Sequence, residues 1–200
     1  MKLFELPGKA AIVTGAGRGI GKATAELFAA VGASVAVLDI SEEHAQRTAE
    51  AIGSAGGTAI ALTCDVTDES AVEAAFAQAA RELGAIVNLA SIMGLSGGIF
   101  PNSSYQASKG GVVNLTRALA LEWAADRIRV NAVAPTFVNT DFTAQIFNNP
   151  DVLEKVEAHT PLGVLPEVDD VAAAILFLAS PAARCVTGIV LPVDSGYLAR

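Results

Sequence analysis

From Lys9 onward, the chain alternates short apolar runs with longer segments whose apolar residues recur at helical spacing. This alternation is typical of a parallel sheet covered by helices, because parallel neighbours need a long crossover connection. The predicted strands are residues 10–14, 34–38, 58–62, 86–90, 128–133 and 189–193, and the predicted helices are 19–31, 42–52, 69–83, 104–124 and 168–179. The fold class that follows is α/β, a doubly wound parallel sheet with helices on both faces. The stretch 139–166 has no strong period and is expected to be a mobile flap over a site.

Length and composition limit the classes of protein that fit. With 200 residues, 52% hydrophobic and 17% charged, the chain suits one folded domain. Its longest apolar run, residues 171–179, is too short to cross a bilayer, and no signal-peptide core precedes the first strand. We therefore predict a cytoplasmic protein without membrane contact. The net charge of −8 argues against a nucleic-acid partner, and Cys64 and Cys185 make neither a disulfide framework nor a metal cluster.

A glycine-rich turn joins the first predicted strand to the first helix and reads Thr14-Gly-Ala-Gly-Arg-Gly-Ile-Gly21. Glycines in this context let the backbone approach a pyrophosphate, and free N–H groups at the helix start face the anion. A nucleotide-triphosphate P-loop fits less well, because its first glycine would fall on Ala16 and Lys22 is followed by Ala23. A glycine turn without any ligand stays open as an alternative. The predicted cofactor contacts here are Gly15, Arg18, Gly19, Ile20 and Gly21.

Carboxylates end the second and third predicted strands. Asp39 could accept hydrogen bonds from both ribose hydroxyls of an adenosine and would repel a 2′-phosphate, which favours NAD over NADP. Asp65 with Val66 closes the third strand, where a carboxylate could reach the adenine amino group. The alternative is that Asp39 simply ends its strand.

Tyr105 and Lys109 are four residues apart in a predicted helix, so their side chains share one face. An ammonium held beneath a phenol favours the phenolate. Ser91 ends the preceding strand, and its hydroxyl could hold a carbonyl oxygen beside that phenol. Together the three side chains predict a proton-donating site for a carbonyl or an alcohol. Taken alone, the pair also suits the surface of an amphipathic helix.

These motifs together resemble the short-chain dehydrogenase/reductase family over nearly the whole chain. The matching stretches are Thr14–Gly21, Asp65-Val66, Ile86–Ser91, Tyr105-x-x-x-Lys109, Arg129–Pro135, and Thr187-Gly with Val193-Asp. The resemblance implies a Rossmann-like, single dinucleotide-binding domain over residues 1–200 that also carries the catalytic site. It implies that Tyr105 is the acid/base, that Lys109 also holds the nicotinamide ribose, and that Ser91 orients the substrate oxygen. Cofactor contacts implied at the nicotinamide end are Tyr105, Lys109, Pro135, Val138 and Thr140.

The chain departs from the family pattern after the helix that ends near Leu83. The family there has a central strand with an Asn-Asn-Ala-Gly motif and a helix that supplies a catalytic asparagine. Here Gly84 is followed at once by Ala85 and the serine-bearing strand, so roughly thirty to fifty residues, the size of a βαβ unit, are missing. We expect a sheet without one central strand and helix, and an oligomer interface without one of its helices. Smaller departures are Thr136, where the family has glycine, and Val164, where arginine is common.

The predicted function is an oxidoreductase that transfers a hydride between NAD(H) and a secondary alcohol or ketone. The alternatives are a catalytically impaired NAD-binding protein and a non-functional deletion product. The residues expected to line the pocket are Phe137, Phe142, Ile146 and Phe147, with the segment 94–100. They suit a hydrophobic small molecule, although packing on the core would explain them equally. His44 and His159 are expected to be solvated.

Overall fold

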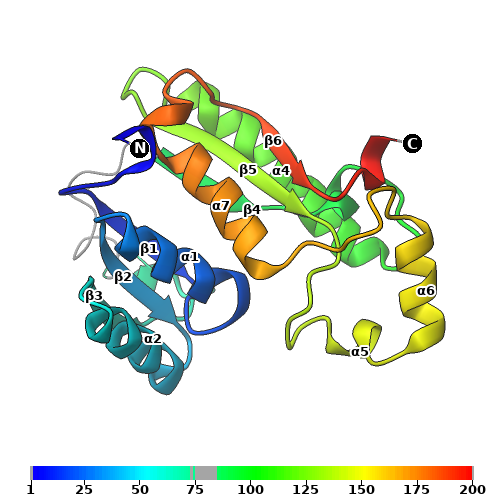
Figure 1. Cartoon of the computed structure of the whole chain (residues 1–200). Coiled ribbons are helices and arrows are strands. Elements are labelled where there is room, and N and C mark those ends of the chain that lie inside the picture. The colour runs from blue at the N-terminus through cyan, green and yellow to red at the C-terminus, as the bar shows by residue number, and fades with distance from the viewer. Residues whose placement is uncertain (1, 73, 75–84, 200) are drawn as a thin grey trace. The chain divides into compact units, whose positions relative to one another are not determined.

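A computed structural model of the chain describes residues 2–72, 74 and 85–199 (Figure 1). The chain divides into two compact units. Unit 1 comprises Met1–Leu83 with Ser180–Ala182, and unit 2 comprises Gly84–Ala179 with Ala183–Arg200. That residues 1–200 act as one dinucleotide-binding domain stays a prediction.

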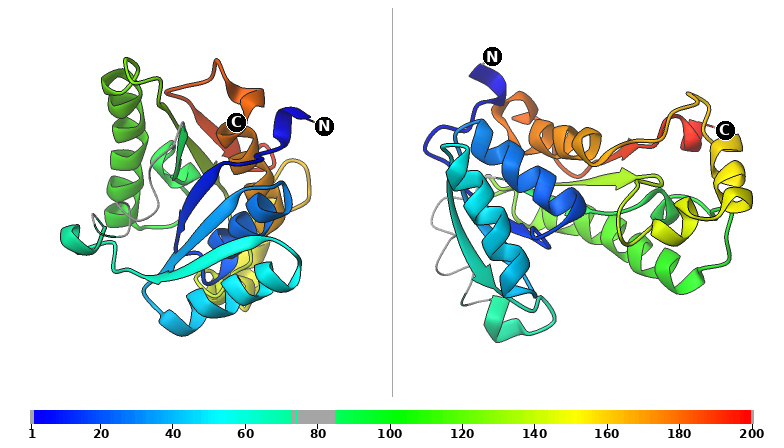
Figure 2. Two further views of the ribbon diagram at one scale, coloured as in Figure 1. Left: turned by 90° about the vertical axis from the view of Figure 1, so that its left-hand side faces the viewer. Right: turned by 60° about the horizontal axis from the view of Figure 1, so that its bottom comes forward.

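Unit 1 is a three-stranded parallel sheet in the order β1-β2-β3. Its elements are β1 (Ala10–Thr14), α1 (Gly19–Ala30), β2 (Ser34–Asp39), α2 (Glu42–Ser54) and β3 (Thr58–Thr63), after a short 3-10 turn at Lys2–Phe4. The apolar side chains of β2 are buried, as expected for the middle strand of a parallel sheet. Helices α1 and α2 contact each other and lie on the same side of the sheet (Figure 2). Ser41 caps α2, because its hydroxyl accepts a hydrogen bond from the His44 N–H.

Unit 2 is also a three-stranded parallel sheet, in the order β4-β5-β6. Its main elements are β4 (Ala85–Leu89), α4 (Ser103–Glu122), β5 (Arg129–Pro135), α5 (Ala144–Phe147), α6 (Pro150–Ala158), α7 (Val168–Ala179) and β6 (Val190–Val193). Short 3-10 turns lie at Ile92–Gly94 and Tyr197–Ala199, and the turn at Pro181–Ala183 belongs mostly to unit 1. Helices α4 and α7 cover opposite faces of this sheet (Figures 1 and 2). Strand β5 is almost entirely buried between them.

The α/β class and the parallel strand pairing are confirmed. Among the described residues, however, the strands form two sheets instead of one continuous sheet: β1 pairs with β2 alone, and β4 pairs with β5 alone. The predicted helix 69–83 lies mostly outside the described residues.

Segment 139–166, where the sequence predicted no helix or strand, contains α5 and α6, and its role as a mobile flap stays a prediction. Asn149 caps α6 by accepting a hydrogen bond from the Val152 N–H, and Pro150 occupies the first helical position. Both residues are recognised helix-start signals. In α6 the apolar residues Val152, Leu153 and Val156 follow a helical spacing, but over nine residues only.

Candidate active site

The glycine turn is packed too tightly for any larger side chain at two of its positions. A Cβ on Gly21 would lie 2.2 Å from the carbonyl oxygen of Gly15, and one on Gly17 would lie 2.7 Å from Oδ2 of Asp39. Gly15 and Gly19 have φ values of 63° and 53°, a region that favours glycine. The turn therefore brings bare backbone to the start of α1, as anion binding requires.

Replacing Gly21 with alanine is expected to destabilise the protein by about 2 kcal/mol, because the added methyl group overlaps backbone that cannot move aside. We expect Tm to fall by roughly 4–8 °C, measured by differential scanning calorimetry. Gly53→Ala is the matched control, because a Cβ there meets nothing within 4 Å and alanine favours the helix. An equal Tm for the two variants would contradict the packing argument.

The Asp39 carboxylate is fixed at the end of β2, beside the glycine turn. Its Oδ2 accepts a hydrogen bond from the Gly17 N–H at 2.9 Å, and its Oδ1 accepts one from the Ser41 N–H at 3.0 Å. Both oxygens are thus held by backbone, which presets the direction of the remaining lone pairs. A ligand hydroxyl at this edge would meet an oriented acceptor.

His44 corrects the expectation of a solvated side chain. It is half-buried, and its Nδ1 is buried without a hydrogen-bond partner. The Cβ atom of His44 and the Oδ2 atom of Asp39 both lie within 2.7 Å of the position that a Cβ on Gly17 would take. The sequence does not predict that His44 lies beside Asp39, because this placement results from the close packing of α2 against Gly17. His159 is also tied to protein, since its Nδ1 contacts the Lys155 carbonyl oxygen at 2.8 Å.

Asp65 and Val66 lie at the same edge of the unit 1 sheet, because the Cys64 N–H donates to the Asp39 carbonyl oxygen. Oδ1 of Asp65 accepts hydrogen bonds from the backbone N–H and the hydroxyl of Thr67. These bonds lower the pKa of the Asp65 carboxyl. Asp65 therefore carries an exposed negative charge at neutral pH.

In unit 2, Lys109 links the first part of α4 to the end of β4. Its Nζ donates a hydrogen bond to the Leu89 carbonyl oxygen at 2.8 Å and lies 5.7 Å from the centre of the Tyr105 ring. Gly94 makes this approach possible, because a Cβ there would lie 2.6 Å from the backbone of Lys109. Burial lowers the pKa of the Lys109 ammonium.

Ser91 follows β4 by two residues and is 7% exposed. Its Oγ accepts a hydrogen bond from the Met93 N–H, which fixes the side chain at the start of a 3-10 turn. The structure thus brings the end of β4, which leads into Ser91, to Lys109. Tyr105 packs against the cluster that contains Ile92 and Met93, the residues directly after Ser91.

One aromatic side chain from segment 139–166, that of Phe142, lies beside Tyr105. Phe142 is 81% exposed, and its ring centre lies 6.3 Å from that of Tyr105. Ile146 and Phe147 are partly buried against the same cluster. Phe137, in contrast, is buried and packs edge-on against Phe100 at 5.9 Å. Phe137 is therefore a core residue, and Phe142 is the aromatic side chain free to meet a ligand.

The segment after β5 is held by Thr143, a residue that the sequence did not single out. Its hydroxyl donates to the Val138 carbonyl oxygen and accepts from the Thr140 N–H at 3.0 Å. Pro135 and Val138 are buried. Unit 1 therefore holds predicted residues Gly15, Arg18, Gly19, Ile20, Gly21, Asp39, Asp65 and Val66, and unit 2 holds Ser91, Tyr105, Lys109, Pro135, Val138 and Thr140.

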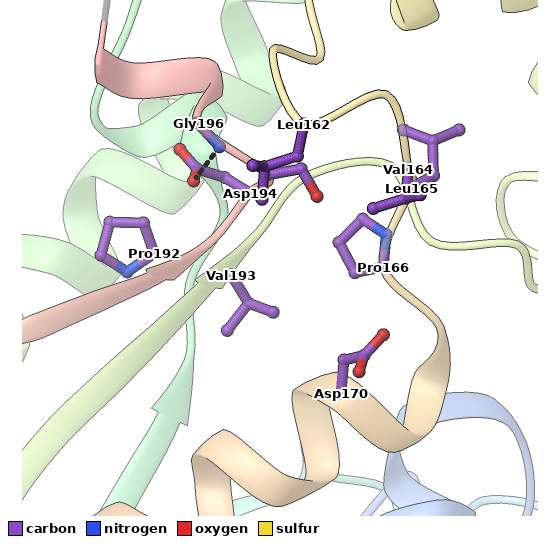
Figure 3. Close-up of a pocket in the computed structure, with 10 residues that line it drawn as sticks. Leu162, Val164, Leu165, Pro166, Asp170, Pro192, Val193, Asp194 and Gly196 are labelled. Atoms are coloured by element: carbon purple, nitrogen blue, oxygen red, sulfur yellow. Dashed lines mark hydrogen bonds between the residues drawn. The ribbon is translucent and has the colours of Figure 1, made fainter.

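A separate cavity of about 440 Å³ lies at the end of β6 (Figure 3). It is lined by the segment 162–166, by Asp170 of α7 and by residues 192–196, and none of the three predicted catalytic residues lines it. Asp194 is engaged there by the backbone N–H groups of Gly196 and Leu198. Asp170 likewise accepts a hydrogen bond from the Glu167 N–H. Both carboxylates thus accept hydrogen bonds from neighbouring backbone N–H groups.

Comparison with known proteins decides the family. Residues 9–86 match the model described as short chain dehydrogenase, and residues 79–198 match the related model described as Enoyl-(Acyl carrier protein) reductase. The chain belongs to the short-chain dehydrogenase/reductase family. Since the matches cover nearly the whole chain, the family assignment applies to both units.

Relatives within this family are similar over nearly their full length. Galactitol 2-dehydrogenase (L-tagatose-forming) from Cereibacter sphaeroides is 38% identical, covering 98% of this chain and 97% of that protein. Cis-4-hydroxycyclohexanecarboxylate dehydrogenase from Sinomonas cyclohexanicum is 37% identical, covering 96% and 97%. These relatives support an oxidoreductase that acts on alcohol groups.

Solved structures of the family support a nicotinamide cofactor. A 7α-hydroxysteroid dehydrogenase complexed with NADH and 7-oxo glycochenodeoxycholic acid matches with a TM-score of 0.91 and 31% identity, over 98% of this chain and 96% of that one. A protein from Agrobacterium tumefaciens with bound NADP matches with a TM-score of 0.87 and 31% identity, over the whole of both chains. The family neighbours therefore include both forms of the cofactor.

The short-chain dehydrogenase/reductase alignments also bear on the missing segment. The alignment to the Cereibacter protein spans 251 positions, whereas this chain has 200 residues, so at least 51 of those positions are gaps in this chain. The residue ranges matched by the two family models overlap at residues 79–86. A deletion between Gly84 and Ala85 stays a prediction, and Gly84 lies outside the described residues.

Within the described part of the chain, no group of three or more His, Cys, Asp or Glu side chains is arranged to hold a metal ion. No helix found there is long and apolar enough to cross a membrane.

Proposed function

We propose that the chain interconverts a hydrophobic secondary alcohol and its ketone with NAD(H), with Tyr105 as general acid/base. The observation that carries the proposal is the position of Lys109, which contacts both the end of β4 beside Ser91 and the ring of Tyr105. Lys109 thus places its ammonium 5.7 Å from the centre of the Tyr105 ring. The phenolate accepts the proton of an alcohol, and the phenol returns it to a ketone oxygen. Ser91 holds that oxygen in place by hydrogen bonding.

The residues present fit a dinucleotide. The glycine turn offers backbone that a Cβ at Gly17 or Gly21 would block, and His44 Nδ1 is a buried polar atom without a partner beside Asp39. Such an atom gains a hydrogen bond when a ligand supplies the partner. When bound, the nicotinamide exchanges the hydride with the carbon that bears the oxygen. The protein places the alcohol or ketone and exchanges the proton on its oxygen.

NAD is proposed over NADP because of Asp39. Backbone N–H groups hold both carboxylate oxygens, so the charge stays at the edge where an adenosine ribose would lie. A ribose hydroxyl can donate to such an oxygen, whereas a 2′-phosphate would be repelled.

The substrate is proposed to be apolar near its reacting carbon. Phe142 beside Tyr105 is aromatic and largely exposed, and Ile146 and Phe147 extend the apolar surface. An alicyclic secondary alcohol would bury these surfaces better than a linear polyol would. A catalytically impaired NAD-binding protein is the second candidate, because the described strands form two sheets rather than one.

NADH titration by fluorescence, with NADPH alongside, tests the binding step without a guess about substrate. Oxidation of 4-substituted cyclohexanols and of galactitol with NAD then tests the chemistry. Turnover of the cyclohexanols alone would support the proposal in full. NADH binding without turnover of any alcohol would favour the second candidate, and no binding would contradict both.

The pH dependence of NADH binding is expected to report on Lys109. Because burial lowers the pKa of this ammonium, the charge is lost at a lower pH than in an exposed lysine. The Kd for NADH should therefore rise as pH increases from about 7 to about 10. In Lys109→Arg the rise should move to higher pH, because a guanidinium keeps its charge.

Lys155→Arg is the control for this titration, because Lys155 is an exposed lysine on α6. It should reproduce the profile of the unmodified protein. Identical profiles for Lys109→Arg and the unmodified protein would show that the Lys109 charge does not support binding.

A further inference from the structure

Gln106, the residue directly after Tyr105 in α4, links the first turn of this helix to segment 94–100. Its Nε2 donates a hydrogen bond to the Gly97 carbonyl oxygen at 2.7 Å and another to Oδ1 of Asn102 at 3.0 Å. A primary amide carries two N–H donors, so both donors of this side chain are in use. The amide is therefore held in one orientation, with the Gly97 carbonyl group against it.

The start of α4 lacks its usual side-chain cap because of this arrangement. Asn102 is the N-cap residue, where asparagine ordinarily accepts a hydrogen bond from a backbone N–H of the first turn. Here the Asn102 side chain makes no capping bond, and its Oδ1 accepts the bond from Gln106 instead. Departures of this kind from local structural rules are expected at functional sites.

The backbone of segment 94–100 fits closely against Gln106. Gly98 has a φ of 70°, and a Cβ at this position would lie 2.5 Å from Sδ of Met93 and 3.3 Å from Nε2 of Gln106. The Met93 N–H in turn donates to Oγ of Ser91 at 3.2 Å. A continuous series of contacts therefore leads from Gln106 to the hydroxyl of Ser91.

The residues that follow Gly98 bring apolar side chains to Tyr105. Ile99 and Phe100 are partly buried and pack against the same cluster as the Tyr105 ring. The hydrogen bond at Gly97 fixes the backbone two residues before Ile99. The position of this apolar surface relative to Tyr105 therefore depends on that bond.

We propose that Gln106 is a positioning residue that sets the fit of the alcohol substrate by holding segment 94–100 beside Tyr105. The proposal rests on the proposed function and assigns Gln106 no contact with the reacting atoms or the cofactor. Removing its hydrogen bonds should loosen the apolar surface that receives the substrate. Proton exchange at Tyr105 and binding of the cofactor should be preserved.

The test compares Gln106→Ala and Gln106→Glu with the unmodified protein in steady-state oxidation of 4-substituted cyclohexanols with NAD. Glutamate keeps the length of the side chain, but an ionised carboxylate has no donor for the Gly97 carbonyl oxygen. We expect both variants to raise KM by about five- to tenfold, as the loss of one or two hydrogen bonds implies. The kcat and the Kd for NADH should hardly change, because uniform binding alone is lost.

Gln46→Ala is the control, because Gln46 is an exposed glutamine on α2. It should reproduce the KM and kcat of the unmodified protein. A KM that stays unchanged in both Gln106 variants would overturn the inference.

Hydrogen exchange of the ligand-free protein, followed by mass spectrometry, gives a readout that does not depend on activity. Peptides that cover residues 94–100 should exchange faster in Gln106→Ala than in the unmodified protein, because an anchor of this segment is removed. Peptides that cover α6 should exchange at the same rate in both. Unchanged exchange at 94–100 would overturn the inference and leave the proposed function standing.

Two further kinetic outcomes would also overturn the inference. A fall in kcat at unchanged KM would indicate a role in proton exchange instead of substrate fit. Equal weakening of NADH and alcohol binding would indicate general damage to the fold. If the unmodified protein oxidises no alcohol, the proposed function fails and the inference fails with it, even where hydrogen exchange at 94–100 responds to Gln106→Ala.

Discussion

Tyr105→Phe is expected to lower kcat for alcohol oxidation by about three orders of magnitude, because the phenolic oxygen is the group that exchanges the proton. The Lys109 ammonium lies 5.7 Å from the ring centre, and phenylalanine keeps that ring. The Kd for NADH should therefore rise by no more than about two- to tenfold, because phenylalanine keeps the ring and loses at most one hydroxyl hydrogen bond to the cofactor. Steady-state kinetics and a fluorescence titration on the same preparation measure both quantities.

Tyr197→Phe is the matched control, because Tyr197 is the other tyrosine of the chain and is buried in the same apolar cluster. It should keep kcat within a few-fold of the unmodified value. Full activity in Tyr105→Phe would remove Tyr105 from the mechanism. Equal losses in the two variants would point to damage of the shared cluster instead.

Asp39→Asn is expected to change the choice of cofactor by about 100-fold. The amide keeps the shape of the side chain and one acceptor oxygen, but it loses the charge that attracts a ribose hydroxyl and repels a 2′-phosphate. NADH should bind about tenfold more weakly and NADPH about tenfold more tightly, each corresponding to about 1.4 kcal/mol. Parallel titrations with NADH and NADPH give the ratio of the two Kd values.

Glu50→Gln controls for the loss of one negative charge from unit 1, because Glu50 is exposed on α2. The ratio of Kd values should not change in this variant. If the ratio is also unchanged in Asp39→Asn, then Asp39 does not set cofactor choice. A fall in affinity for both cofactors would instead show that the held carboxylate mainly supports the glycine turn.

The strands were predictable because buried parallel strands read as short apolar runs. The first strand, at Ala10–Thr14, and the last long helix, at Val168–Ala179, have the predicted bounds. Helix α6 was missed because its apolar spacing, at Val152, Leu153 and Val156, spans little more than one turn, although Asn149 and Pro150 mark its start. The capping residue and the proline after it would have predicted the start of this helix without any apolar period.

The candidate site was predictable only where its residues share one element. Tyr105 and Lys109 lie on one helix, so a four-residue spacing was enough to place them together. The acceptor of Lys109 is the Leu89 carbonyl oxygen, a backbone atom that no motif marks. His44 and Thr143 were missed for the same reason, because their positions depend on how neighbouring segments pack.

The two separate sheets have a consequence for handling the protein. In the described part of the chain, β1 and β4 each form ladder bonds along one edge only, so each has a second row of backbone N–H and C=O groups that belongs to neither ladder. Such rows are templates on which strands of other molecules add, and β1 and β4 are rich in alanine, isoleucine and valine, without proline or charge to block the addition. Purification at low protein concentration is therefore advisable, and loss of material on concentrating would be ascribed to intermolecular strand pairing.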